Sequence, residues 1–540
     1  MPATILLAVV TAVLTVAPDG VTPAERLTIE PGLAPRLLAL APGESTHLPA
    51  WPIEPGRRAD VVLMRRDVYA PGAEIDVIDG EASSKALRST LAFYFGAVAG
   101  DEAEQVVVSV DPRTMRLSSF ARTSEGWTEL RALDGEYLLA PEAGFLDPSI
   151  GPVGFTCEDE STEVAEPEAP PSPPSADIAA PTALNQMTLA VDTDNEFMSL
   201  KFGNSISSAT DYVATLVALM SVVYERDLGV RLVQGTTILR PSTTADPYLQ
   251  SGTGNADSAK LNEFRSIWMA NYASVNRGTA LLLSGKQSSA SSASGIAYVN
   301  ALCSTNTGYA FSQVFKFSGS TASSDTKLVA HEIGHNFGSR HTHCYLDPTP
   351  IDMCYASESG CYSGPTSCPA AQTINGVANV RGTLMSYCHN LAGCSSSSVF
   401  HPRTVDLIDP IVASKVGVCV FPASTANPKE ASPSGAMTAQ RSGTAVSVAY
   451  EPACGATQHT VYAGNLGTLH SGGLAWSQRY CGLGASGSLS FVPSGSVYFV
   501  VVGNSGTIEG SYGARSSGER PAAGAGGACS YTQDLSGSCP

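Results

Sequence analysis

Basic residues are scarce in this 540-residue sequence, which has 31 lysines and arginines against 49 aspartates and glutamates. The imbalance is confined to the first third of the chain. Residues 1–185 contain 28 acidic and 12 basic residues, so the remainder has 21 acidic and 19 basic residues and is nearly neutral. A nearly neutral protein without a basic aromatic patch has no strong field to steer it toward nucleic acid or anionic membranes. We therefore expect no nucleic-acid partner.

Lysine and arginine are missing altogether between residues 132 and 200. This stretch includes an acidic, proline-rich segment, residues 158–185, which we interpret as a linker between domains. Proteases that require a basic residue cannot cut such a segment. Processing is therefore expected to be autocatalytic, or to use a non-basic site, between Glu158 and Leu184.

Long hydrophobic runs are also absent. The apolar stretch from Ile5 to Ala17 is too short to span a bilayer but has the length of a signal-peptide core, although no lysine or arginine precedes it. We predict a signal peptide at residues 1–24, no transmembrane segment in the mature protein, and a secreted, extracellular location. The sequence also has no internal repeat and no glycine-rich phosphate-binding loop.

The thirteen cysteines agree with an oxidising compartment. Eight lie between residues 303 and 419, and four lie between residues 454 and 539. Both numbers are even, so four disulfides in the first group and two in the second are permitted, but the sequence does not determine the pairing. Cys157 is left over.

One run carries the pattern of a catalytic metal site, H-E-x-x-H-x-x-G-x-x-H, from His331 to His341. His331 and His335 are four residues apart, so on a helix they project from the same face and can bind one metal ion. Glu332 can reach a water on that ion and take its proton. Gly338 ends the helix in a left-handed conformation, which turns the chain back and brings His341 in as third ligand. Three protein ligands leave a fourth position open, as in catalytic zinc sites.

This run resembles the zinc motif of the metzincin metallopeptidases, and HEIGHNFG is similar to the reprolysin or adamalysin branch. The same family has a methionine turn downstream, and the segment GTLMSYC, residues 382–388, supplies Met385. Tyr387 matches a tyrosine that astacin-like and serralysin-like relatives place near the metal, so it is a candidate transition-state or rim residue.

The resemblance implies an α+β metzincin catalytic domain at residues 186–421, with a mixed sheet, long helices, the zinc helix and the Met turn. It further implies one catalytic zinc ion and hydrolysis of peptide bonds. Calcium is a second candidate ion whose ligands the sequence does not identify. A protein or peptide substrate would bind in extended form along an edge strand near Gly295 to Ala297, through backbone hydrogen bonds.

The pattern departs from reprolysins after the third histidine, where Thr342 replaces the usual aspartate that anchors the Met-turn segment. We therefore expect a bacterial-type or fungal-type relative. His343 and His389 lie near the motif, but the site already has three ligands, so we interpret both as structural or rim residues.

Periodicity of apolar residues supports the same domain. It predicts helices at residues 211–225 and 259–272 and strands at residues 186–192, 230–239, 280–284 and 296–303.

Residues 25–157 resemble a reprolysin propeptide, here predicted as a β-rich prodomain, because YFGAVAG at 94–100, an apolar run at 106–110 and GEYLL at 135–139 occur in the expected order. In related zymogens a propeptide cysteine occupies the fourth zinc position as thiolate and silences the enzyme. Cys157 is a candidate inhibitory ligand of this kind. Its surroundings, GFTCEDE, do not match the usual switch motif, and an incidental free cysteine is the alternative.

After Cys419 the composition shifts to glycine, serine and alanine, with a connector at residues 422–435. Short apolar runs within residues 436–540 predict a small antiparallel β-sandwich, whose role in adhesion, substrate docking, secretion or stability is open. The leading interpretation of the whole chain is a secreted, monomeric zinc endopeptidase made as a zymogen. The alternative is a noncatalytic secreted or surface binding protein built on a metzincin domain.

Overall fold

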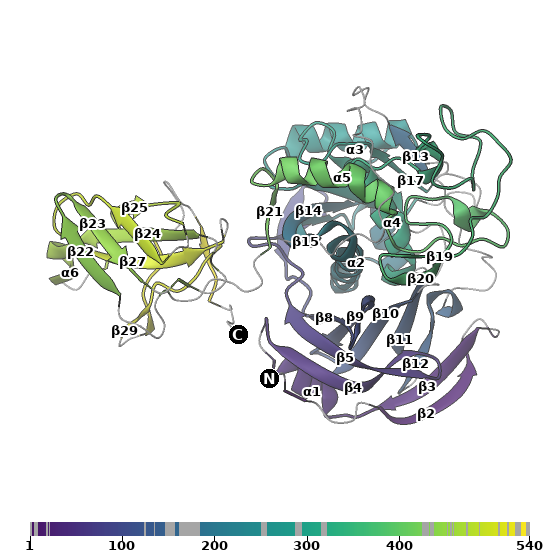
Figure 1. Cartoon of the computed structure of the whole chain (residues 1–540), viewed down its shortest axis with the longest axis horizontal. Coiled ribbons are helices and arrows are strands. Elements are labelled where there is room, and N and C mark those ends of the chain that lie inside the picture. The colour runs from purple at the N-terminus through teal and green to yellow at the C-terminus, as the bar shows by residue number, and fades with distance from the viewer. Residues whose placement is uncertain are drawn as a thin grey trace. The chain divides into compact units, whose positions relative to one another are not determined.

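In the computed structural model the chain forms two compact units (Figure 1). The first unit comprises Met1–Ala39 and Ser45–Phe421, and the second comprises Leu40–Glu44 and Pro422–Pro540. The described residues are 3–4, 9–17, 20, 22–40, 42–123, 126–133, 135–145, 157–160, 184–249, 256–286, 294–314, 321–423, 431, 437–450, 452–453, 456, 458–470, 474–484, 487–505, 508–515, 518–523 and 531–535. Most of the predicted linker and connector therefore lies outside the described residues.

The first unit begins with a large, mostly antiparallel sheet, which forms the bulk of the predicted propeptide. Its order in the described residues is β1-β4-β5-β8-β9-β10-β11-β12-β3-β2. The strands are β1 (Ala3–Thr4), β2 (Val9–Val16), β3 (Pro23–Ile29), β4 (Ser45–Glu54), β5 (Arg57–Arg66), β8 (Ala92–Val98), β9 (Asp101–Asp111), β10 (Arg116–Thr123), β11 (Gly126–Leu133) and β12 (Glu136–Pro141). A short helix, α1 (Leu33–Leu38), and a 3-10 turn, Glu142–Phe145, accompany them.

The residues predicted as a signal peptide supply the two ends of this sheet, because β1 pairs with β4 and β2 pairs with β3. The side chains of Val13 and Leu14 in β2 are 64% and 69% exposed. An apolar strand that leaves such side chains in water contributes little to the core, and the signal peptide stays a prediction.

A second, mixed sheet forms the centre of the predicted catalytic domain. Its order in the described residues is β13-β17-β18-β16-β14-β15-β6-β7, with β21 also paired to β14. The strands are β6 (Ile75–Asp79), β7 (Ala82–Ala86), β13 (Cys157–Glu160), β14 (Asn185–Thr193), β15 (Val230–Leu239), β16 (Thr279–Ser284), β17 (Gly295–Tyr298), β18 (Tyr309–Gln313) and β21 (Val420–Pro422). The central strands run parallel, and β17 runs antiparallel to its neighbour β18.

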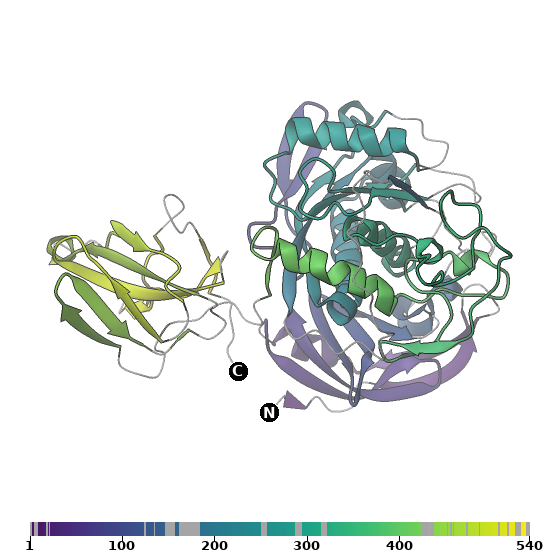
Figure 2. The same cartoon turned by 45° about the horizontal axis from the view of Figure 1, so that its top comes forward.

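Helices cover both faces of the mixed sheet, which therefore has a core on each side (Figure 2). They are α2 (Ile206–Leu228), α3 (Ser258–Asn271), α4 (Ala322–Asn336) and α5 (Pro402–Lys415). Alternate residues of β16 show the period of two: Leu281 and Leu283 join the core of α2 and α4, whereas Ala280 and Leu282 join the core of α3. A sheet buried on both faces explains why these strands are continuous apolar runs.

The long helix α2 corrects the expectation about hydrophobic runs. Among the described residues it is long and apolar enough to cross a membrane, but 78% of its apolar window is buried inside the protein. Ser205 caps its first turn by accepting a hydrogen bond from the Ser208 N–H, and Gly229 ends it with φ of 60°. Its apolar character is thus explained by a position in the core.

The propeptide boundary predicted at residue 157 does not separate two compact bodies. The hairpin of β6 and β7 extends the mixed sheet at β15, and β13 extends it at β17. Side chains from both parts, among them Ile75, Phe95 and Trp127 on one side and Val213 and Leu216 on the other, form one buried cluster. Both sheet edges of the catalytic domain are therefore covered by preceding residues of the same chain.

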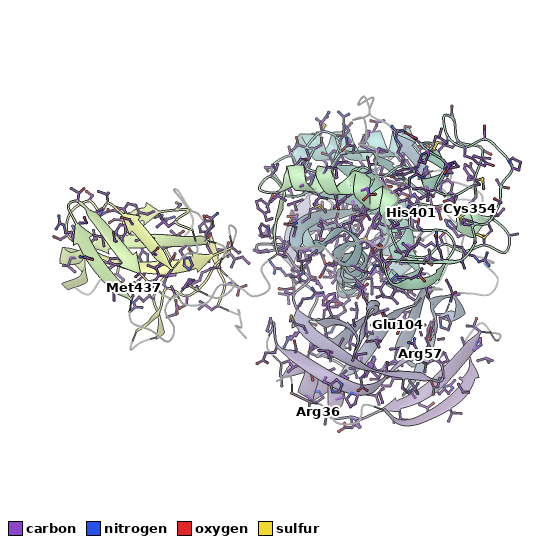
Figure 3. The ribbon with its side chains drawn as sticks, viewed as in Figure 1. Arg36, Arg57, Glu104, Cys354, His401 and Met437 are labelled. Carbon is purple, nitrogen blue, oxygen red and sulfur yellow. A yellow bond between two sulfur atoms is a disulfide. The ribbon has the colours of Figure 1, made fainter. Side chains whose placement is uncertain are left out.

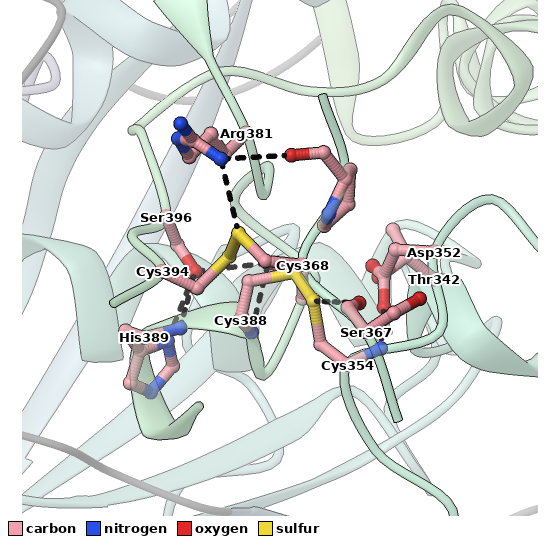
Figure 4. Close-up of a disulfide and its surroundings, with 12 residues drawn as sticks. Thr342, Asp352, Cys354, Ser367, Cys368, Arg381, Cys388, His389, Cys394 and Ser396 are labelled. Atoms are coloured by element: carbon pink, nitrogen blue, oxygen red, sulfur yellow. Dashed lines mark hydrogen bonds between the residues drawn. A yellow bond between two sulfur atoms is a disulfide. The ribbon is translucent and has the colours of Figure 1, made fainter. Parts of the chain in front are cut away.

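Four disulfides join the eight described cysteines between residues 303 and 419, as their even number permitted. The pairs are Cys303–Cys419, Cys344–Cys361, Cys354–Cys388 and Cys368–Cys394. The last two lie side by side in Figure 4 and cross-link the irregular segment after the zinc motif, which also contains the hairpin of β19 (Gln372–Ile374) and β20 (Val377–Val380). Covalent cross-links supply order where regular hydrogen-bond ladders are short.

The second unit contains two principal sheets that share a core. In the described residues one has the order β22-β23-β26 and the other β25-β24-β27-β28-β31. The strands are β22 (Thr438–Ser442), β23 (Ala445–Ala449), β24 (Gln458–Asn465), β25 (Gln478–Tyr480), β26 (Ser488–Phe491), β27 (Val497–Asn504), β28 (Ile508–Glu509) and β31 (Thr532–Gln533). Val448, Phe491, Val461 and Val501 come from both sheets, and Met437 packs against them (Figure 3). Cys481 is disulfide-bonded, whereas Cys454, Cys529 and Cys539 lie outside the described residues.

Candidate metal centre

The first two predicted ligands lie on α4, which begins with a capping box between Thr321 and Ser324. The helix ends at Asn336, and Gly338 follows with φ of +109°. A side chain at this position would be strained, and its Cβ would also lie 2.4 Å from Ile411 Cδ1. The predicted turn at Gly338 is therefore present, and it brings His341 back toward α4.

The imidazoles of His331, His335 and His341 converge, with their side chains fully or almost fully buried. The Nε2 atoms of His331 and His335 are 3.2 Å apart, and ligand atoms of all three residues lie within 4.8 Å of one another. His331 Nδ1 is 2.8 Å from the Leu384 carbonyl oxygen, and His335 Nδ1 is 2.8 Å from the Ser339 carbonyl oxygen. Because a carbonyl only accepts, each Nδ1 carries the proton and each Nε2 offers a lone pair.

Burial lowers the pKa of His331 well below its ordinary value, and the neighbouring His335 and His341 lower it further. The ring is therefore neutral, which is the form that binds metal. Three imidazoles with converging ring nitrogens match the donor set of a catalytic zinc site. The residues present thus fit a zinc ion.

Glu332 is fully buried beside the first of these histidines and lies directly against the edge strand β17. A Cβ added to Gly295 would be 2.1 Å from Glu332 Oε1. Only glycine therefore fits at the start of β17 without moving the carboxylate. The sequence predicted Gly295 only as part of a substrate-binding strand. The need for glycine at this position comes from its contact with Glu332, which is distant in the sequence.

Met385, the predicted Met-turn residue, is buried against α4. It is 1% exposed, and a Cβ added to Gly334, between the two histidines of α4, would lie 2.6 Å from its sulfur. Thr342, the residue that replaces the usual aspartate, anchors this turn because its N–H donates to the Met385 carbonyl oxygen at 3.0 Å. The Thr342 hydroxyl donates to the buried carboxylate of Asp352, next to Cys354 (Figure 4). Thr342 thus links the end of the zinc motif to the segment that carries Met385 by hydrogen bonds, although it is not an aspartate.

Tyr387 lies at the three imidazoles rather than at a rim. Its side chain is 2% exposed, and its hydroxyl is 3.0 Å from His341 Nε2, the nitrogen that faces the other ligands. The ring centroids of Tyr387 and His341 are 4.6 Å apart.

The two neighbouring histidines do not join the three Nε2 atoms. His343 is fully buried, and its Nε2 is 2.8 Å from Glu358 Oε2. His389 is half-buried, and its Nδ1 is 3.1 Å from Ser396 Oγ. Both thus lie against other partners, and His343 occupies a structural position in the interior.

Glu358 is a site residue that the sequence did not reveal. It lies 17 positions after His341, and its Oε2 is 2.8 Å from His341 Nδ1. Burial raises the pKa of Glu358, but hydrogen bonds from His341 and His343 outweigh burial and hold the pKa well below its ordinary value. The carboxylate is therefore ionised and can accept from both rings. No motif at Glu358 signals this role.

Within the described part of the chain, two further groups of residues have metal-ligating atoms close together, but their chemistry argues against a metal. One contains His341, His343, Cys344 and Glu358, and the other contains Cys354, Cys388 and Cys394. All four cysteines are in disulfides, so none of them is a thiolate ligand. In the first group, the facing ring nitrogens of the histidines are already committed to Glu358.

Cys157 begins β13, and its Cα is paired with that of Gly295 at the start of β17. Since Gly295 contacts Glu332, the backbone of Cys157 lies at the same end of the edge strand as the candidate site. The side chain of Cys157 is outside the described part of the structure.

One of the comparisons with known proteins, the family model, indicates a catalytic class. Residues 183–397 match the family model Reprolysin_5, described as metallo-peptidase family M12. No curated protein matches the sequence. Among solved structures, metalloproteinase-II from Bacteroides fragilis is 11% identical with a TM-score of 0.34, covering 57% of this chain and 85% of that chain. A chaperone–substrate complex is 12% identical with a TM-score of 0.25, covering 42% and 35%. At these TM-scores neither likeness supports a conclusion.

Proposed function

Residues 183–397 form a metzincin-like zinc metalloendopeptidase domain of family M12, and from its site we propose that the protein is a secreted endopeptidase made as a zymogen. The observation that carries this proposal is the convergence of His331, His335 and His341 beside the buried Glu332. Metal ligands alone would suit a structural site, whereas an adjacent buried carboxylate supplies a proton acceptor.

The three Nε2 atoms of His331, His335 and His341 are the proposed zinc ligands, and Met385 is the proposed floor of the site. When bound, zinc lowers the pKa of a coordinated water to about 7 and polarises the substrate carbonyl. The Nδ1 atoms of His331 and His335 each donate a hydrogen bond to a backbone carbonyl oxygen. The main chain therefore holds both rings in their orientation.

Glu332 is the proposed general base. Its buried carboxylate takes a proton from the attacking water and then delivers it to the nitrogen of the leaving amine, so that the proton is returned and the carboxylate is regenerated. The Tyr387 hydroxyl, 3.0 Å from His341 Nε2, is placed to donate a hydrogen bond to the negative charge that develops on the substrate carbonyl oxygen.

The proposed substrate is an extended peptide that adds to β17, whose first residue, Gly295, contacts Glu332. In the present chain β13 pairs with all four residues of β17. The segment from Cys157 to Glu160 therefore occupies the edge that an extended substrate would use. This pairing supports a zymogen in which β13 blocks substrate. The further proposal, that the Cys157 sulfur takes the fourth metal position, rests on the backbone of Cys157 lying beside Gly295.

Further properties follow as proposals from the same interpretation. The four described disulfides of the first unit support an extracellular protein, and we propose a monomer of the bacterial or fungal branch. The second unit is a β-sandwich-like module, whose two sheets with a shared core support that assignment. Calcium is a further proposed ion without assigned ligands.

The alternative is a noncatalytic binding protein that retains zinc. Comparison of the processed protein with Glu332→Gln tests both proposals, through hydrolysis of a quenched fluorescent protein substrate and measurement of zinc content. We expect the variant to keep its zinc and to lose about 10² to 10⁴-fold in kcat, because only proton transfer is removed. Asp347→Asn, which neutralises an exposed carboxylate, should match the parent. If the parent and Glu332→Gln both hold zinc and are equally inactive, the binding function is favoured.

A further inference from the structure

The third proposed ligand is oriented differently from the first two. His331 and His335 each donate from Nδ1 to a backbone carbonyl oxygen, whereas His341 Nδ1 donates to a side-chain carboxylate, Glu358 Oε2, at 2.8 Å. The orientation of His341 therefore depends on a residue that could be changed without altering the main chain.

Glu358 is itself fixed from a second direction. His343 Nε2 donates to the same oxygen at 2.8 Å, and the rings of His341 and His343 stack with an interplanar angle of 4° and a centroid distance of 5.5 Å. The two donors therefore approach one carboxylate oxygen from residues two apart in one segment. Such a carboxylate has little freedom to leave the His341 ring.

A disulfide closes the loop that carries Glu358. Cys344 follows the two histidines, Cys361 follows Glu358 by three residues, and the two cysteines are bonded. Their sulfurs lie 3.1 and 3.3 Å from Glu358 Oε1, so the second carboxylate oxygen packs against the cross-link. The side chain of Glu358 is 21% exposed. The segment bearing His341 and the loop bearing Glu358 are thus joined covalently where they meet.

From this geometry we infer that Glu358 is a positioning residue for the third metal ligand, with His343 as its support. A carboxylate that accepts from the distal nitrogen of a ligand imidazole fixes the tautomer and ring orientation, and it makes the metal-facing nitrogen a better donor. This inference rests on the proposed role of His341 as a zinc ligand. It extends that role by assigning to Glu358 and His343 a function in metal retention that the zinc motif does not include.

The test is a zinc titration of the metal-free full chain against a competing chelator, for the parent, Glu358→Ala and Glu358→Gln. We expect Glu358→Ala to weaken zinc binding about 10 to 100-fold. Glu358→Gln keeps an acceptor oxygen and should recover part of the loss. Asp347→Asn, an exposed carboxylate on the same disulfide-closed loop, should bind zinc as the parent does.

A double-mutant cycle separates positioning from a general effect on folding. In a His341→Ala background the additional change Glu358→Ala should weaken zinc binding no further, because the ring on which Glu358 acts is gone. An equal further loss in that background would overturn the inference, and so would a Glu358→Ala variant that binds zinc as tightly as the parent. Should Glu358→Ala fail to fold, the same cycle with Glu358→Gln decides the question. A parent chain that binds no zinc would contradict the proposed function instead.

Discussion

Residues that precede the predicted catalytic domain cover both edges of the mixed sheet. They are packed into the hydrophobic core at one edge, whereas at the other they form only a short paired strand. At the β15 edge, β6 pairs with residues 237–239, and Gln234 exchanges backbone hydrogen bonds with Val68 and Ala70. Ile75, at the start of β6, is 1% exposed and belongs to the same core as α2. At this edge the predicted propeptide is part of the folded interior.

Ion pairs strengthen the same side of the molecule. Arg66 on β5 is 2.7 Å from Glu225 on α2, and Arg231 is 3.3 Å from the same carboxylate. Arg113 also pairs with Asp211 on α2. The Arg66–Glu225 pair is the more buried of these contacts between the two segments, with side chains 17% and 14% exposed, so removal of one partner leaves a poorly hydrated charge.

At the β17 edge the covering is a single strand of four residues, Cys157 to Glu160, paired through its backbone. This edge lies next to Glu332 and the proposed metal ligands. The β15 edge lies at the other end of the strand order. The predicted propeptide is therefore packed into the core at one edge of the sheet, whereas at the other edge it contributes only a short paired strand. β13 can therefore leave β17 while β6 stays paired with β15.

The largest loss of stability is expected from Ile75→Asp, which disrupts the packing of β6 in the core that it shares with α2. The change removes a buried apolar side chain and places a charge in the core, so the free energy of unfolding of the full chain should fall by more than about 3 kcal/mol. Chemical denaturation measures the loss. Ser83→Asp, at an exposed position of the neighbouring strand β7, should change stability by less than about 0.5 kcal/mol. Equal losses in the two variants would contradict this packing of β6.

A smaller effect is expected from Arg66→Met, because Arg231 still pairs with Glu225. We expect a loss of about 1–3 kcal/mol at neutral pH. Burial raises the pKa of Glu225, but Arg66 and Arg231 outweigh burial and lower it to about 2 from 4.5. The carboxylate thus stabilises the parent fully above about pH 4.5, and this contribution is lost as the pH falls toward 2.

The acid dependence provides the check on Arg66. Denaturation between pH 7 and pH 2 should show a smaller acid-induced loss for Arg66→Met than for the parent, because the pKa of Glu225 returns toward its ordinary value. The matched control is Arg57→Met, since Arg57 forms a more exposed pair with Glu104 (Figure 3) and its loss should cost about 0–1 kcal/mol. An identical acid profile in Arg66→Met and the parent would show that this pair does not anchor the propeptide.

The smallest effect on stability is expected from Cys157→Ala, which leaves the backbone pairing of β13 intact. Stability should change by no more than about 0.5 kcal/mol. The uncleaved chain should nevertheless gain hydrolysis of a substrate small enough to reach the metal without pairing with β17, because the proposed sulfur ligand is gone while β13 still covers the strand. The double variant Cys157→Ala with Glu332→Gln should show no such gain. An uncleaved Cys157→Ala chain as inactive as the parent would contradict the latch.

The sequence predicted the local part of the site better than the rest. His331, Glu332 and His335 lie on one helix, where spacing alone determines which side chains meet, and Gly338 has the backbone angle that its type suggested. The strands β14, β15 and β16 and the helices α2 and α3 were likewise predictable, because strands buried on both faces leave long apolar runs. The strand predicted at residues 296–303 ends at Tyr298, and β18 and α5 were not predicted.

Contacts between distant segments could not be predicted in this way. Glu358 reaches His341 only because a disulfide-closed loop folds back, and nothing in the residues around it encodes that path. Even cysteine numbers permitted four bridges but left their connectivity open. The pairing of β6 with β15 and of β13 with β17 depends on strand edges that no local pattern distinguishes.

One zinc ion held by the Nε2 atoms of His331, His335 and His341 is the proposal on which the others depend. Anomalous diffraction at the zinc edge, from crystals of the zinc-loaded full chain, locates the metal directly. We predict a single strong peak about 2.0–2.1 Å from each of the three Nε2 atoms. A peak beside His343 and Glu358, or no peak at the three imidazoles, would contradict the account.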